Sequence, residues 1–158
     1  ATDWDGPVYV RLTRDPEPVI FDETHNFQIG KSYIVREGTD ITLMATGSQT
    51  IRVLQAAELL SNEGVSAHVL HVPSIKPIDT EAIVAAAVKT GKVVTAEDHS
   101  VIGGLGGAVA ELLGEYHPTP VKRVGIADCF GESAANEDLL EKYGLTPRHV
   151  AEKAIKML

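Results

Sequence analysis

One stretch, residues 93–113, constrains the fold more than any other, because it joins three different local patterns in a fixed order. It reads VVTAEDHSVIGGLGGAVAELL: an apolar run typical of a buried strand, then Glu97, Asp98 and His99, then four glycines and an apolar helical face. A strand that opens at its carboxyl end into glycines and a helix N-terminus is where open α/β sheets bind ligands. We therefore expect a strand over residues 92–96, an acidic turn after it, and a candidate site at the glycine loop.

The spacing of the glycines argues against a nucleotide or phosphate at this loop. Gly104, Gly106 and Gly107 do not reproduce the GxGxxG fingerprint, and no Lys-Ser/Thr pair follows as in a P-loop. A helix N-terminus favours an anion by only ~0.3–1 kcal/mol. A carboxylate 4 Å away repels an anion by about 4 kcal/mol at an effective dielectric of 20. Close packing of strand against helix is the simplest interpretation, and an interface or cation role for the acidic turn is the alternative.

The residues Glu97, Asp98 and His99 could be acid–base groups or metal ligands, but the pattern favours neither. Neighbouring strand residues point to opposite faces, so two adjacent carboxylates rarely share one ion. Ser133 lacks the G-x-S-x-G context of a nucleophile, and Cys129 has Asp128 beside it and no neighbouring Lys or Arg. We predict no catalytic or metal-binding residue here. The candidate interface contacts are Glu97, Asp98, His99, Gly103, Gly104, Gly106 and Gly107.

The rest of the chain from residue 31 alternates strand and helix patterns, which predicts a mostly parallel sheet covered on both faces. The fold class is therefore α/β, a three-layer α/β/α arrangement with a five-stranded sheet. Its first strand is short and polar, which suits an antiparallel edge. Asp79 and Thr146 are predicted N-caps. The expected strands are 32–36, 41–45, 67–72, 92–96 and 121–126, and the expected helices with sequence-defined ends are 49–62, 80–89, 137–143 and 147–158.

Residues 1–30 differ from this regular pattern. Residues 8–12 alternate like a strand, two prolines in DPEP break it, and residues 21–28 show no period. We interpret residues 1–30 as the tail of a preceding domain plus a linker, with a floppy extension as the alternative. Arg14 ends the predicted strand, and an Arg at a strand end suits a phosphate through its bidentate guanidinium. Pairing of Arg14 with Asp15 or Glu17 in solvent is the other possibility.

The charge and cysteine content exclude several classes of protein. A net charge of -8 argues against a nucleic-acid or anionic-membrane partner, both of which need clustered Lys and Arg. The single cysteine excludes an internal disulfide and is typical of a reducing, cytoplasmic protein. A first residue other than Met suggests a piece of a longer protein.

Five segments of the chain stand out when taken in order. They are GPVYVRLTR at 6–14, IGKSYIVREGTDITLMATG at 29–47, IKPID at 75–79, TGKVVTAEDHSVIGGLGGAVAE at 90–111, and FGESA with LLEKYGLT at 130–146. Together they resemble the C-terminal part of the transketolase family, including the split type whose C-terminal half is a separate subunit. FGESA followed by the GLT segment favours transketolase over related thiamine enzymes.

The resemblance implies a cytoplasmic transferase of the pentose phosphate pathway that moves a two-carbon ketol unit between sugar phosphates with thiamine diphosphate and Mg. It implies that other domains bind this cofactor, that residues 1–30 are the tail of a pyrimidine-binding domain plus a linker, and that residues 31–158 form the C-terminal domain. It matches Arg14 to the arginine that grips the substrate phosphate. The expected partners are the N-terminal and pyrimidine-binding domains or subunit, in a homodimer. The chain alone is expected to be inactive.

Two alternatives to a transketolase remain open. The first is the equivalent domain of 1-deoxyxylulose-5-phosphate synthase or of a 2-oxo-acid dehydrogenase beta subunit, which share the pattern. The second is a stand-alone α/β module that binds a small molecule. Residues preceding Ala1 would separate them, because a glutamate-bearing domain there supports a thiamine enzyme.

Overall fold

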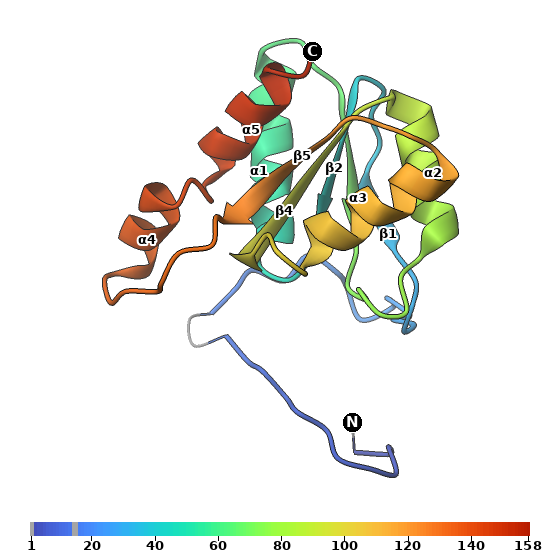
Figure 1. The fold of residues 1–158 in the computed structure, drawn as a ribbon, viewed down its shortest axis with the longest axis vertical. Coiled ribbons are helices and arrows are strands. Elements are labelled where there is room, and N and C mark those ends of the chain that lie inside the picture. The colour runs from blue at the N-terminus through green and yellow to red at the C-terminus, as the bar shows by residue number, and fades with distance from the viewer. Residues whose placement is uncertain (1, 14–15) are drawn as a thin grey trace.

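The sheet at the centre of the molecule has five strands in the order β1-β3-β2-β4-β5 (Figure 1). The computed structural model describes residues 2–13 and 16–158. β1 is antiparallel to β3, and all the other neighbours are parallel. The strands are β1 Tyr33–Arg36, β2 Ile41–Ala45, β3 Ala67–His71, β4 Val93–Ser100 and β5 Val121–Ile126, and the helices are α1 Gln49–Asn62, α2 Thr80–Thr90, α3 Leu105–Tyr116, α4 Asn136–Lys142 and α5 Pro147–Ile155.

Helices cover both faces of the sheet, as the sequence predicted. α1 and α5 lie on one face and α2 and α3 on the other, which Figure 1 shows on either side of the strands. Alternation along β2 explains how: Ile41, Leu43 and Ala45 join the core under α1 and α5, whereas Met44 joins the core under α2 and α3. Thr42 also faces α2, where its hydroxyl donates to the Ala86 carbonyl at 3.0 Å. Every residue of β2 is consequently buried.

Several local predictions are confirmed. α1 spans the predicted residues, and β1 is an antiparallel edge strand. The Asp79 side chain accepts from the Ala82 N–H at 3.3 Å and so caps α2. Thr146 occupies the N-cap position of α5, but its hydroxyl pairs with His149 Nδ1 instead of a backbone N–H.

The predicted end of the fourth strand at residue 96 is wrong. β4 continues to Ser100, and Ser100 pairs with Ile126 of β5. The pairing register shifts between Ala96 and Ser100, so Glu97, Asp98 and His99 lie in an irregular part of a strand. A bulge of this kind changes where side chains point without ending the strand. The acidic turn of the sequence interpretation is therefore a bulged strand end.

Residues 8–12 do not form a strand in this chain, because no strand among the described residues pairs with them, so their predicted place in a preceding domain stays a prediction. The segment runs away from the domain as an extended stretch (Figure 1). Val8, Tyr9, Val10 and Leu12 are all exposed, with Tyr9 at 89%. A strand needs a partner for its backbone hydrogen bonds, and the described residues offer none at this place.

The second half of the N-terminal segment is attached to the sheet by an aromatic cluster. Phe21 stacks on His25 with 4.0 Å between ring centroids, and it also contacts Tyr33 of β1 and His71 of β3. Thr50 Oγ1 lies 2.7 Å from His71 Nδ1. Burial and, to a smaller extent, the charge that His25 carries when protonated together lower the pKa of His71 to about 4. His71 therefore stays neutral in the folded protein well below pH 6.

We predict that His71 makes the fold less stable in mild acid. Its folded pKa lies below the ordinary value of 6.5, so the unfolded chain binds the extra proton between pH 6.5 and pH 4, and stability falls as pH falls through that window. After discounting for partial solvent access, the loss from pH 7 to pH 4.5 is about 1–2 kcal/mol. Urea unfolding of wild type and His71→Gln at both pH values measures it, because the glutamine keeps a polar group but does not titrate. His117→Gln, at the other end of the domain, is the control; equal pH dependence of all three proteins would contradict the prediction.

Candidate functional site at the carboxyl edge of the sheet

The carboxylate of Glu97 fills the N-terminus of α3. Its Oε2 accepts from the Leu105 N–H at 2.7 Å and its Oε1 accepts from the Gly106 N–H at 2.9 Å. The side chain is fully buried, and His99 Nε2 lies 2.7 Å from Oε2. A helix N-terminus has unpaired N–H groups and a positive dipole end, so it is the place where an acidic side chain is most stable. The position that a phosphate would need is occupied by the protein itself.

Two of the four glycines make this contact possible. A Cβ on Gly104 would overlap Glu97 Oε2, and one on Gly106 would come within 2.7 Å of Thr95 Oγ1. Gly103 has a φ of +73°, which favours glycine, and Gly107 has no close neighbour. The packing role weighed in the sequence analysis therefore applies to Gly104 and Gly106. The Glu97 carboxylate occupies the N–H groups of α3 that a phosphate at this loop would need.

The carboxylate of Asp98 points to the other face of the sheet. Ser48, at the N-terminus of α1, donates its hydroxyl to Asp98 Oδ2 at 3.0 Å, and His99 Nδ1 lies 3.5 Å from Oδ1. β2 and β4 are adjacent strands whose following helices cover opposite faces of the sheet. Their carboxyl ends therefore form the topological switch point, where open α/β folds form crevices. Each of the two neighbouring carboxylates meets a different helix N-terminus there.

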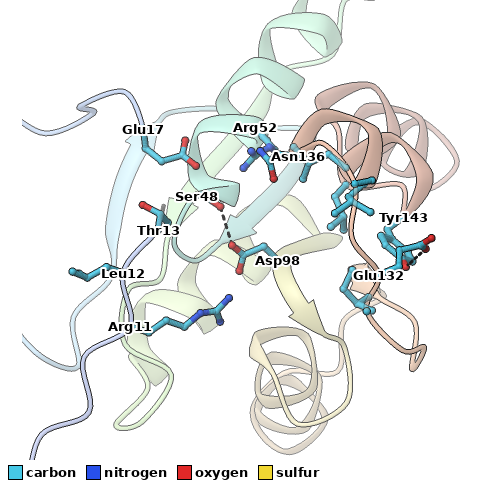
Figure 2. Close-up of a pocket in the computed structure, with 16 residues that line it drawn as sticks. Arg11, Leu12, Thr13, Glu17, Ser48, Arg52, Asp98, Glu132, Asn136 and Tyr143 are labelled. Atoms are coloured by element: carbon cyan, nitrogen blue, oxygen red, sulfur yellow. Dashed lines mark hydrogen bonds between the residues drawn. The ribbon is translucent and has the colours of Figure 1, made fainter. Parts of the chain in front are cut away.

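A cleft of about 460 Å³ opens at this switch point, a size that accommodates a small ligand or a peptide segment. Figure 2 shows Asp98 at its centre, with its bond to Ser48. The walls are the ends of β4 and β5, the first turn of α1, α4 and the loop before it, and part of the N-terminal segment. The lining residues are Arg11, Leu12, Thr13, Glu17, Ser48, Arg52, Asp98, Ile126, Gly131, Glu132, Ala134, Asn136, Leu139, Leu140, Tyr143 and Leu145.

Charged side chains of both signs face one another in this cleft. Arg52 contributes a guanidinium from α1, and its buried Nη1 finds no hydrogen-bond partner among the described residues. Arg11 and Glu17 approach from the N-terminal segment. In Figure 2 the Arg11 guanidinium points toward Asp98, and the Glu17 carboxylate points toward Arg52. The cleft therefore suits a partner that can donate and accept, and not a simple anion.

The outer wall is held by a cluster around Glu132. The phenol of Tyr143 donates to Glu132 Oε1 at 2.6 Å, and Lys142 Nζ lies 2.6 Å from the same oxygen. The hydrogen bond to the carboxylate raises the pKa of Tyr143 to about 12, because ionisation would place two negative charges together. Hydrogen bonds from Lys142 and Tyr143 lower the pKa of Glu132. Tyr143 therefore acts here as a neutral donor that ties the loop before α4 to the domain.

The structure brings Glu97, Asp98 and His99 together with the glycine loop, but it divides them between two environments. Glu97, Gly104 and Gly106 are used internally, and Asp98 faces the cleft. Arg14 lies outside the described residues. Sequence reasoning missed Ser48 and Arg52; the Gly-Ser pair after a buried strand was the available signal, because it marks the start of α1 beside the switch point.

Two features are absent from the described residues. Within residues 2–13 and 16–158, no three His, Cys, Asp or Glu side chains are grouped as metal ligands. In the same part of the chain, no helix has the length and apolar character needed to span a bilayer.

The fold and its cleft define a doubly wound α/β domain with an antiparallel edge strand, and comparison with known proteins gives its family. The model of the family "Transketolase, C-terminal domain" matches residues 30–150. The chain is 51% identical over 150 residues, 95% of its length, to a 6-deoxy-6-sulfo-D-fructose transketolase subunit of Clostridium sp., and covers 47% of that protein. It is 39% identical, over 96% of its length, to 1-deoxy-D-xylulose-5-phosphate synthase of Trichormus variabilis and covers 24% of it.

A solved structure supports the same assignment. A split-gene transketolase, described as an inactive beta4 tetramer, superposes with a TM-score of 0.88 at 49% identity, over 90% of this chain and 47% of that one. This protein belongs to the transketolase family, through the family's C-terminal domain. The chain spans about half the length of the transketolase relatives it matches.

We predict that Glu97 is a main source of stability at this edge. Glu97→Ala leaves two buried N–H groups of α3 without a partner, which costs about 2–4 kcal/mol in the free energy of unfolding. Glu97→Gln keeps one acceptor oxygen, so its free energy of unfolding should fall between those of wild type and Glu97→Ala. Urea unfolding measures both, with Glu111→Gln on the exposed face of α3 as the matched control, expected within about 0.5 kcal/mol of wild type. A Glu97→Ala loss no larger than the control's would show that the contact contributes little.

Proposed function

We propose that this chain is the C-terminal part of a transketolase that transfers a two-carbon ketol unit between sugar phosphates with thiamine diphosphate. The observation that carries the proposal is the 51% identity to a transketolase subunit over 95% of the chain, which extends through the N-terminal segment as well as the family domain. Thiamine diphosphate and Mg would be bound by the rest of the enzyme. In this chain the anion position at the N-terminus of α3 is already filled by Glu97.

We propose that residues 1–30 are the tail of the pyrimidine-binding domain plus a linker, and that residues 31–158 are the C-terminal domain. Support comes from the exposed apolar side chains of Val8, Tyr9, Val10 and Leu12. A row of uncovered apolar side chains on an extended segment suits an inner strand of another domain's sheet. The linker is attached to the C-terminal domain by the Phe21 cluster described above.

The partner we propose is the remainder of the same enzyme, as preceding domains or as a separate subunit, in a homodimer in the cytoplasm. Among the predicted interface residues, Asp98, His99, Gly103 and Gly107 keep some solvent access at the carboxyl edge. Ile102, in the same loop, is 65% exposed. These residues suit a contact with that partner better than Glu97, Gly104 and Gly106, which are enclosed within the domain.

The substrate we propose is a ketose phosphate, of the pentose phosphate pathway or of a related sugar-degrading route. The related Clostridium protein is named for a sulfonated fructose. A second candidate function, 1-deoxyxylulose-5-phosphate synthesis, is favoured by the 39% identity to the Trichormus enzyme. Assaying the complete enzyme for both products separates them: ketol exchange between sugar phosphates supports the first, and 1-deoxyxylulose 5-phosphate formation supports the second.

We predict that ketol transfer requires the partner domains. This chain alone should show no turnover and no Mg-dependent heat of thiamine diphosphate binding in calorimetry, and the complete enzyme should show both. The physical reason is that a diphosphate–Mg site needs clustered oxygen ligands, and the described residues hold no such cluster. Tight, Mg-dependent binding to the chain alone would overturn the proposal.

We also predict that Arg14 contacts the substrate phosphate in the complete enzyme. A charged hydrogen bond of this kind contributes roughly 1.5–3 kcal/mol, so Arg14→Ala should raise KM for phosphorylated sugars about 10- to 100-fold. KM for a sugar without phosphate should stay unchanged. Arg36→Ala, on the edge strand, is the control for general loss of charge. Unchanged KM values for phosphorylated sugars would remove Arg14 from the substrate site.

A further inference from the structure

The cleft at the switch point has one wall from the C-terminal domain and another from the N-terminal segment, and their charges are complementary. The N-terminal segment presents Arg11 and Glu17, and the domain presents Asp98 and Arg52. Figure 2 shows the positive group of each wall pointing toward the negative group of the other. Within the described residues, neither Arg11 with Asp98 nor Glu17 with Arg52 forms a direct ion pair. The two charges of each pair therefore lie on opposite walls of the cleft without touching.

The two domain-side charges differ in what they contact before any partner arrives. Asp98 receives a hydrogen bond from Ser48 at 3.0 Å and lies 3.5 Å from His99 Nδ1, so its orientation is set by α1 and by its own strand. Arg52 stands one turn into α1, with Nη1 buried and without a hydrogen-bond partner among the described residues. A buried guanidinium N–H without an acceptor is costly. A carboxylate brought to Arg52 would relieve that cost.

We propose that the C-terminal domain clamps the N-terminal segment through two crossed charge pairs, Arg11 with Asp98 and Glu17 with Arg52. The occupant of the cleft is thus this chain's own N-terminal segment, through its described residues Arg11 and Glu17, chosen because their charges match those of the opposite wall. The two pairs flank Arg14 in the sequence, so closing both limits where that residue can lie. Asp98 and Arg52 are then positioning residues for substrate binding, an inference that rests on the proposed role of Arg14.

The length of the linker makes such a clamp useful. The aromatic cluster anchors the segment at Phe21, seven residues beyond Arg14. Seven residues of extended chain reach roughly 23–25 Å, far more than the tolerance of a substrate contact. Two additional anchors on either side of Arg14 reduce this freedom. The C-terminal domain would in this way contribute to sugar-phosphate affinity without touching the substrate.

The chain provides its own probe for the docking, since it contains one tryptophan and one cysteine. Trp4 lies in the N-terminal segment, and the exposed Cys129 lies in the loop beside the cleft. With a neutral coumarin maleimide on Cys129, energy transfer from Trp4 reports how often the segment is docked. Arg11→Glu or Asp98→Arg should each raise the undocked fraction about two- to fivefold, and the double variant should restore it. Glu17→Arg or Arg52→Glu alone should also raise the undocked fraction, and the two together should restore docking.

The control is Glu58→Arg, a charge reversal on the exposed face of α1 outside the cleft. The same variants in the complete enzyme should raise KM for phosphorylated sugars with kcat nearly unchanged, and the swapped pairs should recover it. If the double variants show the sum of the single effects and no recovery of energy transfer, the clamp is overturned. If a variant of the domain fails to fold, Arg11→Glu alone still tests whether loss of this charge lowers energy transfer. Recovery in energy transfer with KM unchanged throughout would keep the clamp and overturn the proposed role of Arg14.

Discussion

The contact between the Glu97 carboxylate and the first turn of α3 is the interaction on which the carboxyl edge of this domain depends. It satisfies two N–H groups of the helix and places a full negative charge at the positive end of its dipole. It also requires glycine at 104, because any side chain there would displace the carboxylate. The same contact removes the anion site that a strand, a glycine loop and a helix would otherwise create. A strand–glycine loop–helix pattern that often binds a ligand serves here to fix the helix α3 to the strand β4.

Because Glu97 occupies the anion position at α3, the side chains that are free to contact a ligand or another domain lie on the other face of the sheet. Glu97 and Asp98 are neighbours in sequence, yet one is enclosed under α3 and the other looks into the cleft beside α1. The reason is the strand itself, which sends successive side chains to opposite faces, and the bulge that places His99 against both carboxylates. The cleft lies where β2 and β4 send their helices to opposite sides, as the topology of open α/β sheets requires.

The N-terminal segment gives this arrangement a functional meaning within a transketolase-family protein. Its first part exposes apolar side chains suited to another domain, and its second part is fixed to the sheet by Phe21, Tyr33 and His71. Between these two parts lies Arg14, the residue with the strongest sequence argument for substrate contact. In the clamp proposed above, charge complementarity across the cleft would link the C-terminal domain to that residue by position.

The sequence by itself determined the class of fold, the antiparallel edge strand, the bounds of α1 and the cap of α2, because these follow from hydrophobic period, turn residues and capping that act within a few residues. It also predicted, through charge alone, that the glycine loop is a poor phosphate site. Only the tertiary structure decided that β4 runs to Ser100, since that depends on pairing with Ile126. Only the tertiary structure brought Arg52, Ser48 and Asp98 into one cleft, because residues 46–50 positions apart meet through strand order, and no local pattern encodes which strands are neighbours. Residues 8–12 have the alternating pattern of a strand but do not form one here. A strand needs a neighbouring strand for its backbone hydrogen bonds, and the alternation of side chains does not show whether the same chain provides that neighbour.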